Sequence, residues 1–170
     1  MKKPDLPLGK RWKAVFSLTA LLVVAADQFS KIWIRSYSEG FVVFEAGFFR
    51  VIHVHNTGAA FGLFQDQSFA LTIIALVGVV AILVYAFLFS RYFPFLNNIL
   101  GWVTFGLILG GTTGNLIDRL NPNLSGVTDF IGIGIWPVFN IADSGITVGV
   151  ILLAYSLLSL SRAKNTDLSD

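Results

Sequence analysis

The sequence has no cysteine and few charged residues, and each shortage excludes a class of function. Without cysteine there is no disulfide bond, no thiol nucleophile and no thiolate metal ligand, although the redox compartment stays open. Asp, Glu, Lys and Arg make up 13% of the residues, whereas a soluble domain has about 25%. The net charge is only +2, and no dense basic patch with interleaved aromatics indicates a nucleic-acid partner.

Apolar residues, by contrast, make up 55% of the chain and gather in long runs. A membrane helix needs about 20 mostly apolar residues. Four segments meet this requirement, at residues 14–34, 68–90, 96–117 and 139–161. The second and third carry no charge, and the fourth carries only Asp143, near its start. We therefore predict a single integral membrane domain, residues 1–170, with four transmembrane helices.

The basic residues are distributed unevenly about these spans, and cytoplasmic loops carry the excess of Lys and Arg. Eight fall on one side, namely Lys2, Lys3, Lys10, Arg11, Lys13, Arg91, Arg162 and Lys164, and four on the other, namely Lys31, Arg35, Arg50 and Arg119. Both termini are expected in the cytoplasm. An alternative is a signal peptide cleaved after Val24-Ala25-Ala26, although three spans follow and cleavage would leave the new N-terminus outside.

Two segments are expected on the outer side. Residues 40–66 are rich in Val, Phe and Ile and punctuated by glycine, which predicts short strands or an amphipathic surface layer. Residues 118–138 hold many Asn, Gly and Pro, which predicts turns and loop. His53 and His55 alternate along the first segment. They are half of a metal site at most, and without further ligands a half-exposed strand surface is favoured.

The charged clusters within the spans all fall at one depth, near the outer ends. Ionisable groups in a membrane are costly, so each invites a functional hypothesis. Asp27 and Lys31 share a helix face at the i,i+4 spacing, as do Asn115 and Arg119, and Asn140 and Asp143 share one at i,i+3. Asp129 and Asn56 lie in the outer segments. Taken singly, such residues can also cap helices or reach towards headgroups, with Asn140 as an N-cap and Asp143 favouring the helix dipole.

Glycines in spans three and four are spaced for close helix packing. Gly106, Gly110 and Gly114 lie four residues apart, as do Gly145 and Gly149. Small residues at this spacing let helices approach closely. We expect a contact within the molecule rather than a dimer, and we expect it to hold the polar ends of spans three and four together.

Carboxylates are the remaining catalytic chemistry. Ser144 has no nearby histidine or lysine to activate it. Asp129 and Asp143 can meet if the loop before span four folds back. Two close carboxylates share one proton, so the ionised one can activate a water and the protonated one can polarise a peptide carbonyl. Which aspartate holds the proton stays open.

The sequence resembles the bacterial lipoprotein signal peptidase family, an aspartic peptidase family also called signal peptidase II. Five segments carry the resemblance, and their joint order and spacing are specific although each is short: Asp27-Gln28-Phe29-Ser30-Lys31, Asn56-Thr57-Gly58-Ala59-Ala60-Phe61, Gly111-Thr112-Thr113-Gly114-Asn115-Leu116-Ile117-Asp118-Arg119, Val127-Thr128-Asp129-Phe130 and Phe139-Asn140-Ile141-Ala142-Asp143-Ser144.

The resemblance implies four helices with an outer β-rich cradle. It implies an endopeptidase of the bacterial inner membrane, acting near the outer leaflet. That enzyme cleaves diacylglyceryl-modified prolipoproteins before the lipidated cysteine and is inhibited by globomycin-type peptides. For this chain we expect no cofactor, no metal and a monomer in contact with membrane lipids, although the sequence does not fix the oligomeric state. Asp129 and Asp143 match the catalytic pair. The supporting or substrate-binding positions match Asp27, Lys31, Asn56, Gly58, Asn115, Arg119, Asn140 and Ala142.

Four positions depart from the commoner family pattern, and none of them replaces a catalytic group. Thr112-Thr113 stand where Ala-Leu is frequent, Thr128 where Val is frequent, and Gly145 where Ala is frequent.

Two other functions remain as alternatives. A small polytopic transporter or channel would place polar residues at the midplane, where this chain is largely apolar. A metal-dependent lipid enzyme would use the aspartates to hold Mg²⁺, and it would lose activity in EDTA.

Overall fold

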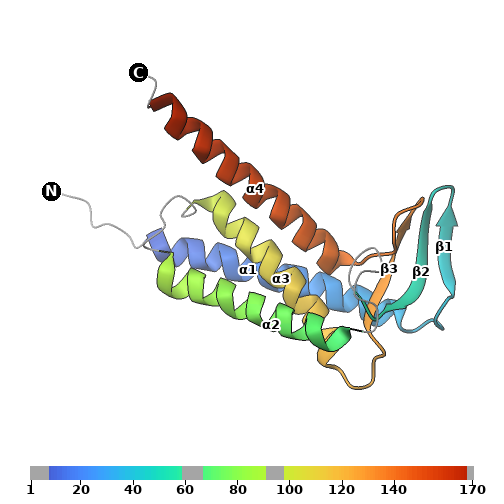
Figure 1. Ribbon diagram of the computed structural model, residues 1–170. Helices are drawn as coiled ribbons and strands as arrows, with labels where there is room; N and C mark the ends of the chain where they lie inside the picture. Colours follow the sequence, from blue (N-terminus) through green and yellow to red (C-terminus); the bar gives the residue numbers. More distant parts are fainter. Residues whose placement is uncertain (1–7, 59–66, 91–97, 168–170) are drawn as a thin grey trace.

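Four helices form the body of the molecule, seen in a computed structural model that describes residues 8–58, 67–90 and 98–167 (Figure 1). The helices are α1 (Leu8–Ile34), α2 (Ser68–Val84, continued by the π-helical turn η2, Tyr85–Phe89), α3 (Ile99–Leu120) and α4 (Ile141–Asp167). All four are long and apolar enough to cross a membrane, as predicted. Residues 59–66 of the predicted outer segment, and with them Ala59 to Phe61 of the second matching segment, lie outside the described residues. So do Lys2, Lys3 and Arg91.

The third helix, α3, is the centre of the bundle and packs against each of the other three. Its glycine row faces α1, because a Cβ on Gly110 would lie 2.7 Å from the Val23 Cβ. In α4, Gly149 lies against Thr104 and Ile108 of α3, and Gly145 lies between Val23 of α1 and Leu107 of α3. The expected internal contact is therefore confirmed. The row in α3 packs mainly against α1, and its last member, Gly114, also meets Ala142 of α4.

A three-stranded antiparallel sheet caps one end of the bundle, in the order β1 (Val42–Ala46), β2 (Phe49–Asn56) and β3 (Val127–Ile133) (Figure 1). The described ends of α1 and α4, at residues 8 and 167, lie at the opposite end. A two-residue turn joins β1 to β2, where Gly47 takes φ 60°, a conformation that favours glycine. The expected strands in residues 40–58 are confirmed, and the fold class with them.

The interpretation of residues 118–138 as turns and loop was wrong in part, because β3 lies within them. Pairing with β2 creates this strand, placing Val54 opposite Asp129 and Asn56 opposite Val127. Gly132 leaves room for the Arg50 side chain that crosses it, since a Cβ there would lie 2.6 Å from the Arg50 Cγ. Five of the seven residues of β3 are Val, Thr, Phe or Ile, which favour strands, but the Asn, Gly and Pro residues around them hid this signal.

The expectation of a half-exposed strand surface holds for His55 but needs correction for His53. His53 is buried, with 4% of its surface exposed, rather than half-exposed, and its Nδ1 lies 2.8 Å from the Tyr37 carbonyl oxygen. The His55 ring packs edge-on against it, and His55 Nδ1 lies 3.2 Å from Glu39. In the described parts of the chain, no group of three His, Asp or Glu side chains lies close enough to hold a metal ion.

Candidate active site

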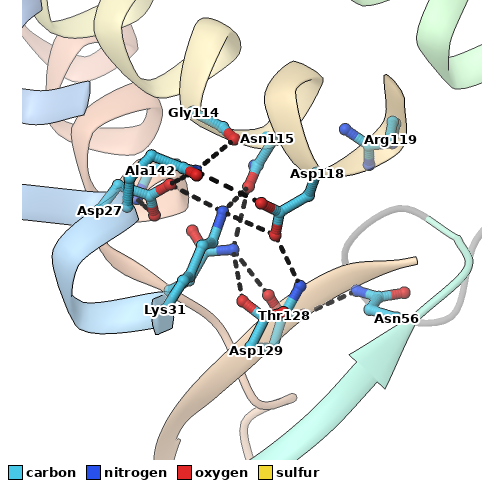
Figure 2. A network of polar contacts seen from close by, with 12 residues as sticks. Asp27, Lys31, Asn56, Gly114, Asn115, Asp118, Arg119, Thr128, Asp129 and Ala142 are labelled. Atoms are coloured by element: carbon cyan, nitrogen blue, oxygen red, sulfur yellow. Dashed lines mark hydrogen bonds and ion pairs between the residues drawn. The ribbon is translucent and has the colours of Figure 1, made fainter. Parts of the chain in front are cut away.

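The polar residues predicted from sequence converge where the helix bundle meets the sheet (Figure 2). The first helix contributes a buried ion pair to this cluster. Lys31 Nζ lies 2.8 Å from Asp27 Oδ2, and both side chains are fully buried. Asp27 Oδ1 accepts from the backbone N–H of Ala142, and Lys31 donates to Asn115 Oδ1 at 3.0 Å. The pair therefore ties α1 to both α3 and α4, and each charge has its partner within the protein.

The start of α4 fixes one of the two candidate catalytic carboxylates. Asn140 is buried and caps the helix, since its Oδ1 accepts from the Asp143 backbone N–H at 2.8 Å. The Asp143 carboxylate returns the bond by accepting from the Asn140 N–H at 3.2 Å. This reciprocal arrangement is a capping box. Asn115 Nδ2 donates to the other carboxylate oxygen at 2.7 Å, which leaves Asp143 half-buried in a fixed orientation.

The second carboxylate, Asp129, lies on β3 and is 1% exposed. Asn140 Nδ2 donates to its Oδ1 at 2.7 Å, and Asn56 Nδ2 donates to its Oδ2 at 2.9 Å. Asn140 therefore contacts both carboxylates. Burial, and then the neighbouring charge of Asp143, raise the pKa of Asp129 from 3.8 to about 7, although both asparagine donors and Lys31 oppose the rise.

The two aspartates line one cavity of about 580 Å³ between the sheet and the bundle. Its polar wall also includes Asn56, Asn115 and Arg119. The rest of the lining is largely apolar and comes mainly from the β3–α4 connection and the outer end of α4, including Trp136, Val138, Phe139, Ile146 and Val148. The cavity thus combines a carboxylate pair with apolar surface, which suits a peptide with apolar side chains.

The loop after β2 reaches this cavity through Asn56 and Gly58. The Asn56 side chain donates to Asp129 and accepts from the Gly58 backbone N–H at 2.9 Å. The Gly58 carbonyl accepts from Arg119 Nη2 at 3.3 Å. All ten residues predicted for the site are therefore brought together. Asn56, Gly58, Asn115, Arg119, Asp129 and Asp143 line the cavity, and Asp27, Lys31, Asn140 and Ala142 support it from behind.

Four further residues of the same network are not among the ten predicted site residues. Asp118 is buried and accepts from the Thr128 N–H at 3.0 Å, and it forms an ion pair with Arg35 at 2.6 Å. Gln28 Nε2 lies within hydrogen-bond distance of Asp27, Asp118 and the Gly114 carbonyl. Gln28, Asp118 and Thr128 lie inside the five segments that carry the family resemblance, and that position could have marked them as site residues. Arg35 was counted only for orientation, and nothing local marks it as a partner of Asp118.

The family model of signal peptidase II, described as "Signal peptidase (SPase) II", matches residues 19–159. The chain belongs to the signal peptidase II family. It is 45% identical over 148 residues to the lipoprotein signal peptidase of Dehalococcoides mccartyi, covering 85% of this chain and 91% of that protein. It is 42% identical over 147 residues to the lipoprotein signal peptidase of Moorella thermoacetica, covering 84% and 92%.

Signal peptidase II membership agrees with the architecture. A bacterial membrane enzyme solved by the in meso method at 2.3 Å superposes with a TM-score of 0.76 at 33% identity, covering 89% of this chain and 92% of that one. The matched residues 19–159 contain every residue of the network from Asp27 to Asp143. The family and the four long apolar helices together make this a multi-pass membrane peptidase.

Proposed function

We propose that this protein is an aspartic endopeptidase that removes signal peptides from prolipoproteins, with Asp129 and Asp143 as the catalytic pair. The observation that carries the proposal is their shared setting. Two carboxylates from β3 and α4 line one cavity and are joined by hydrogen bonds to the same residue, Asn140. The relatives named lipoprotein signal peptidase supply the substrate class. A transporter or channel is not favoured by this family.

The raised pKa of Asp129 supports a division of roles. Asp129 keeps its proton up to about pH 7, so it is the acid that polarises the scissile carbonyl. Ionised Asp143 then takes a proton from a water, whose oxygen attacks the carbonyl carbon. Asp129 then protonates the peptide nitrogen as the C–N bond breaks and the amine leaves, and the proton that Asp143 took from the water returns to Asp129 for the next cycle. Asn115 and Asn140 hold the Asp143 carboxylate in place during this transfer.

The position of the cavity supports a membrane-held substrate. It lies at the sheet end of the four spans, and the basic residues favour this end as the outer one. On this proposal, both termini are cytoplasmic and the site works at the outer leaflet of the bacterial inner membrane. The substrate is a diacylglyceryl-modified prolipoprotein cut before its lipidated cysteine, and globomycin-type peptides occupy the same apolar cavity.

The experiment is cleavage of lipidated and unlipidated prolipoprotein by purified protein. Asp129→Asn and Asp143→Asn should each lower kcat by at least about 1,000-fold, because each removes a proton-transfer group. Glu45→Gln is the matched control, since Glu45 is exposed on β1, and it should cleave like the wild type. Full activity of either aspartate variant would refute the pair. Loss of wild-type activity in EDTA would favour the Mg²⁺ alternative.

The pH dependence follows from the Asp129 carboxyl. If Asp129 is the acid, kcat/KM should fall as pH rises through about 7, since its proton is then lost. The folded state also holds more protons than the unfolded state between about 3.8 and 7. Stability should therefore decrease across that window, by at most about 4 kcal/mol. Asp129→Asn should remove this part of the decrease, measured as the melting temperature in detergent at pH 5 and pH 8. An equal decrease in the variant would assign it to another group.

A further inference from the structure

Thr128, the residue directly before Asp129, is held at three of its atoms. Its backbone N–H donates to Asp118 Oδ2 at 3.0 Å, and its hydroxyl Oγ1 accepts from Arg35 Nε at 2.8 Å. Its carbonyl oxygen lies 3.4 Å from Asn140 Nδ2, the same amide that donates to Asp129. Thr128 is fully buried, so no water replaces these partners. The backbone that carries Asp129 is therefore fixed from two sides.

Arg35 supplies the link between α1 and this backbone. It directly follows the last residue of α1, and its N–H still donates to the Lys31 carbonyl at 2.9 Å, which continues the helical path. Its Nη2 pairs with Asp118 Oδ1 at 2.6 Å while its Nε donates to Thr128. A guanidinium is a rigid planar fork, so two partners bound at once fix their relative positions. Lysine has a single ammonium and cannot reproduce that geometry.

We propose that Arg35 is a positioning residue that sets the place of Asp129 in the catalytic pair by clamping Thr128 and Asp118 together. This inference rests on the proposed function, since it requires Asp129 to act in cleavage. Arg35 itself does not line the cavity. Its removal therefore acts on the chemical step through Thr128 and leaves substrate contacts intact. A carboxylate moved by a fraction of an ångström loses much of its catalytic effect.

The test is a double-mutant cycle on purified protein, with kcat and KM measured separately on lipidated prolipoprotein. Arg35→Gln should lower kcat roughly tenfold and Thr128→Val roughly fivefold, each with KM changed less than about twofold. The double variant should be close to Arg35→Gln alone rather than roughly fiftyfold lower, because both changes break the same bond. Arg35→Lys should recover only part of the lost kcat, since it restores the charge without the fork.

Two controls match these variants. Thr128→Ser keeps the hydroxyl and should stay within about twofold of wild type, whereas a purely structural role for this site would affect it through the lost methyl group. Arg50→Gln removes an exposed arginine from β2 and should leave kcat unchanged. If Arg35→Gln does not fold, the difference in kcat between Thr128→Val and Thr128→Ser decides the question alone.

The inference is overturned if Thr128→Val and Thr128→Ser cleave equally, if the double variant shows the product of the two single effects, or if only KM changes. Asp129→Asn separates this from the proposed function. An active Asp129→Asn variant refutes the catalytic pair itself. If Asp129→Asn is inactive but Arg35→Gln folds and keeps the wild-type kcat, only the role of Arg35 is refuted.

Discussion

The helices α2 and α3 have spans of the same length, 22 residues, but opposite surroundings. The α2 span has a mean hydropathy of 2.8, and 6% of its apolar 18-residue stretch is buried. The α3 span has a mean hydropathy of 1.3, and 56% of the corresponding stretch is buried. The more apolar helix is thus the more exposed one. In a membrane the solvent is itself apolar, so hydropathy marks contact with lipid, and small or polar residues mark the interior. In α3, the buried glycines and the buried Asn115 and Asp118 are the small and polar residues that mark the interior.

The largest expected effect comes from adding bulk to each helix at a glycine. Gly110→Val in α3 should prevent recovery of folded protein, because a Cβ there would lie 2.7 Å from both the Ala20 carbonyl oxygen and the Val23 Cβ of α1. Gly78→Val in α2 should fold and cleave normally, because a Cβ there meets nothing within 4 Å. Folded yield by size-exclusion chromatography in detergent measures both. Equal yields would mean that the interior position of α3 is not set by these glycines.

A second contrast replaces a polar residue in each helix. Asn115→Leu should lower kcat at least about 100-fold, because Asn115 donates to Asp143 and accepts from Lys31 and Asn140. Thr72→Val in α2 removes only a hydroxyl that donates to the Ser68 carbonyl of its own helix, and it should change kcat less than about twofold. Cleavage of lipidated prolipoprotein checks both. A matching loss in Thr72→Val would break the distinction between the two helices.

Much of the fold is predictable from the sequence because each signal is local. The spans follow from apolar runs, and the polar cluster follows from orientation combined with i,i+3 and i,i+4 spacing, as at Asn140 and Asp143. The capping interpretation and the functional interpretation of that pair turn out to be compatible, since one set of hydrogen bonds both starts α4 and holds the carboxylate. The family segments then named ten residues that the structure brings together.

The parts that were missed depend on partners distant in the chain. β3 contains strand-forming residues, but its turn-rich surroundings masked them, and its pairing with β2 is what fixes it as a strand. The glycine spacing predicts a close helix contact within the molecule, but it does not show that the row of α3 packs mainly against α1. Arg35 was counted as a charge, although it contacts Asp118 and Thr128, residues more than 80 positions away. Such contacts are set by tertiary geometry.

The smallest expected effect is a loss of stability when one apolar side chain is shortened in each helix. These changes test helix packing without altering a catalytic group. Leu109 of α3 is 8% exposed within the bundle, whereas Ile74 of α2 is 66% exposed. Leu109→Ala should lower the free energy of unfolding by about 1 to 2 kcal/mol. The loss comes from the cavity left in the bundle, because moving a leucine side chain from lipid into the protein interior contributes little. Ile74→Ala should cost less than about 0.5 kcal/mol, since lipid fills the vacated space. Unfolding of both variants in mixed micelles gives the two values. A larger loss for Ile74→Ala would mean that α2 has a protein partner on its exposed face.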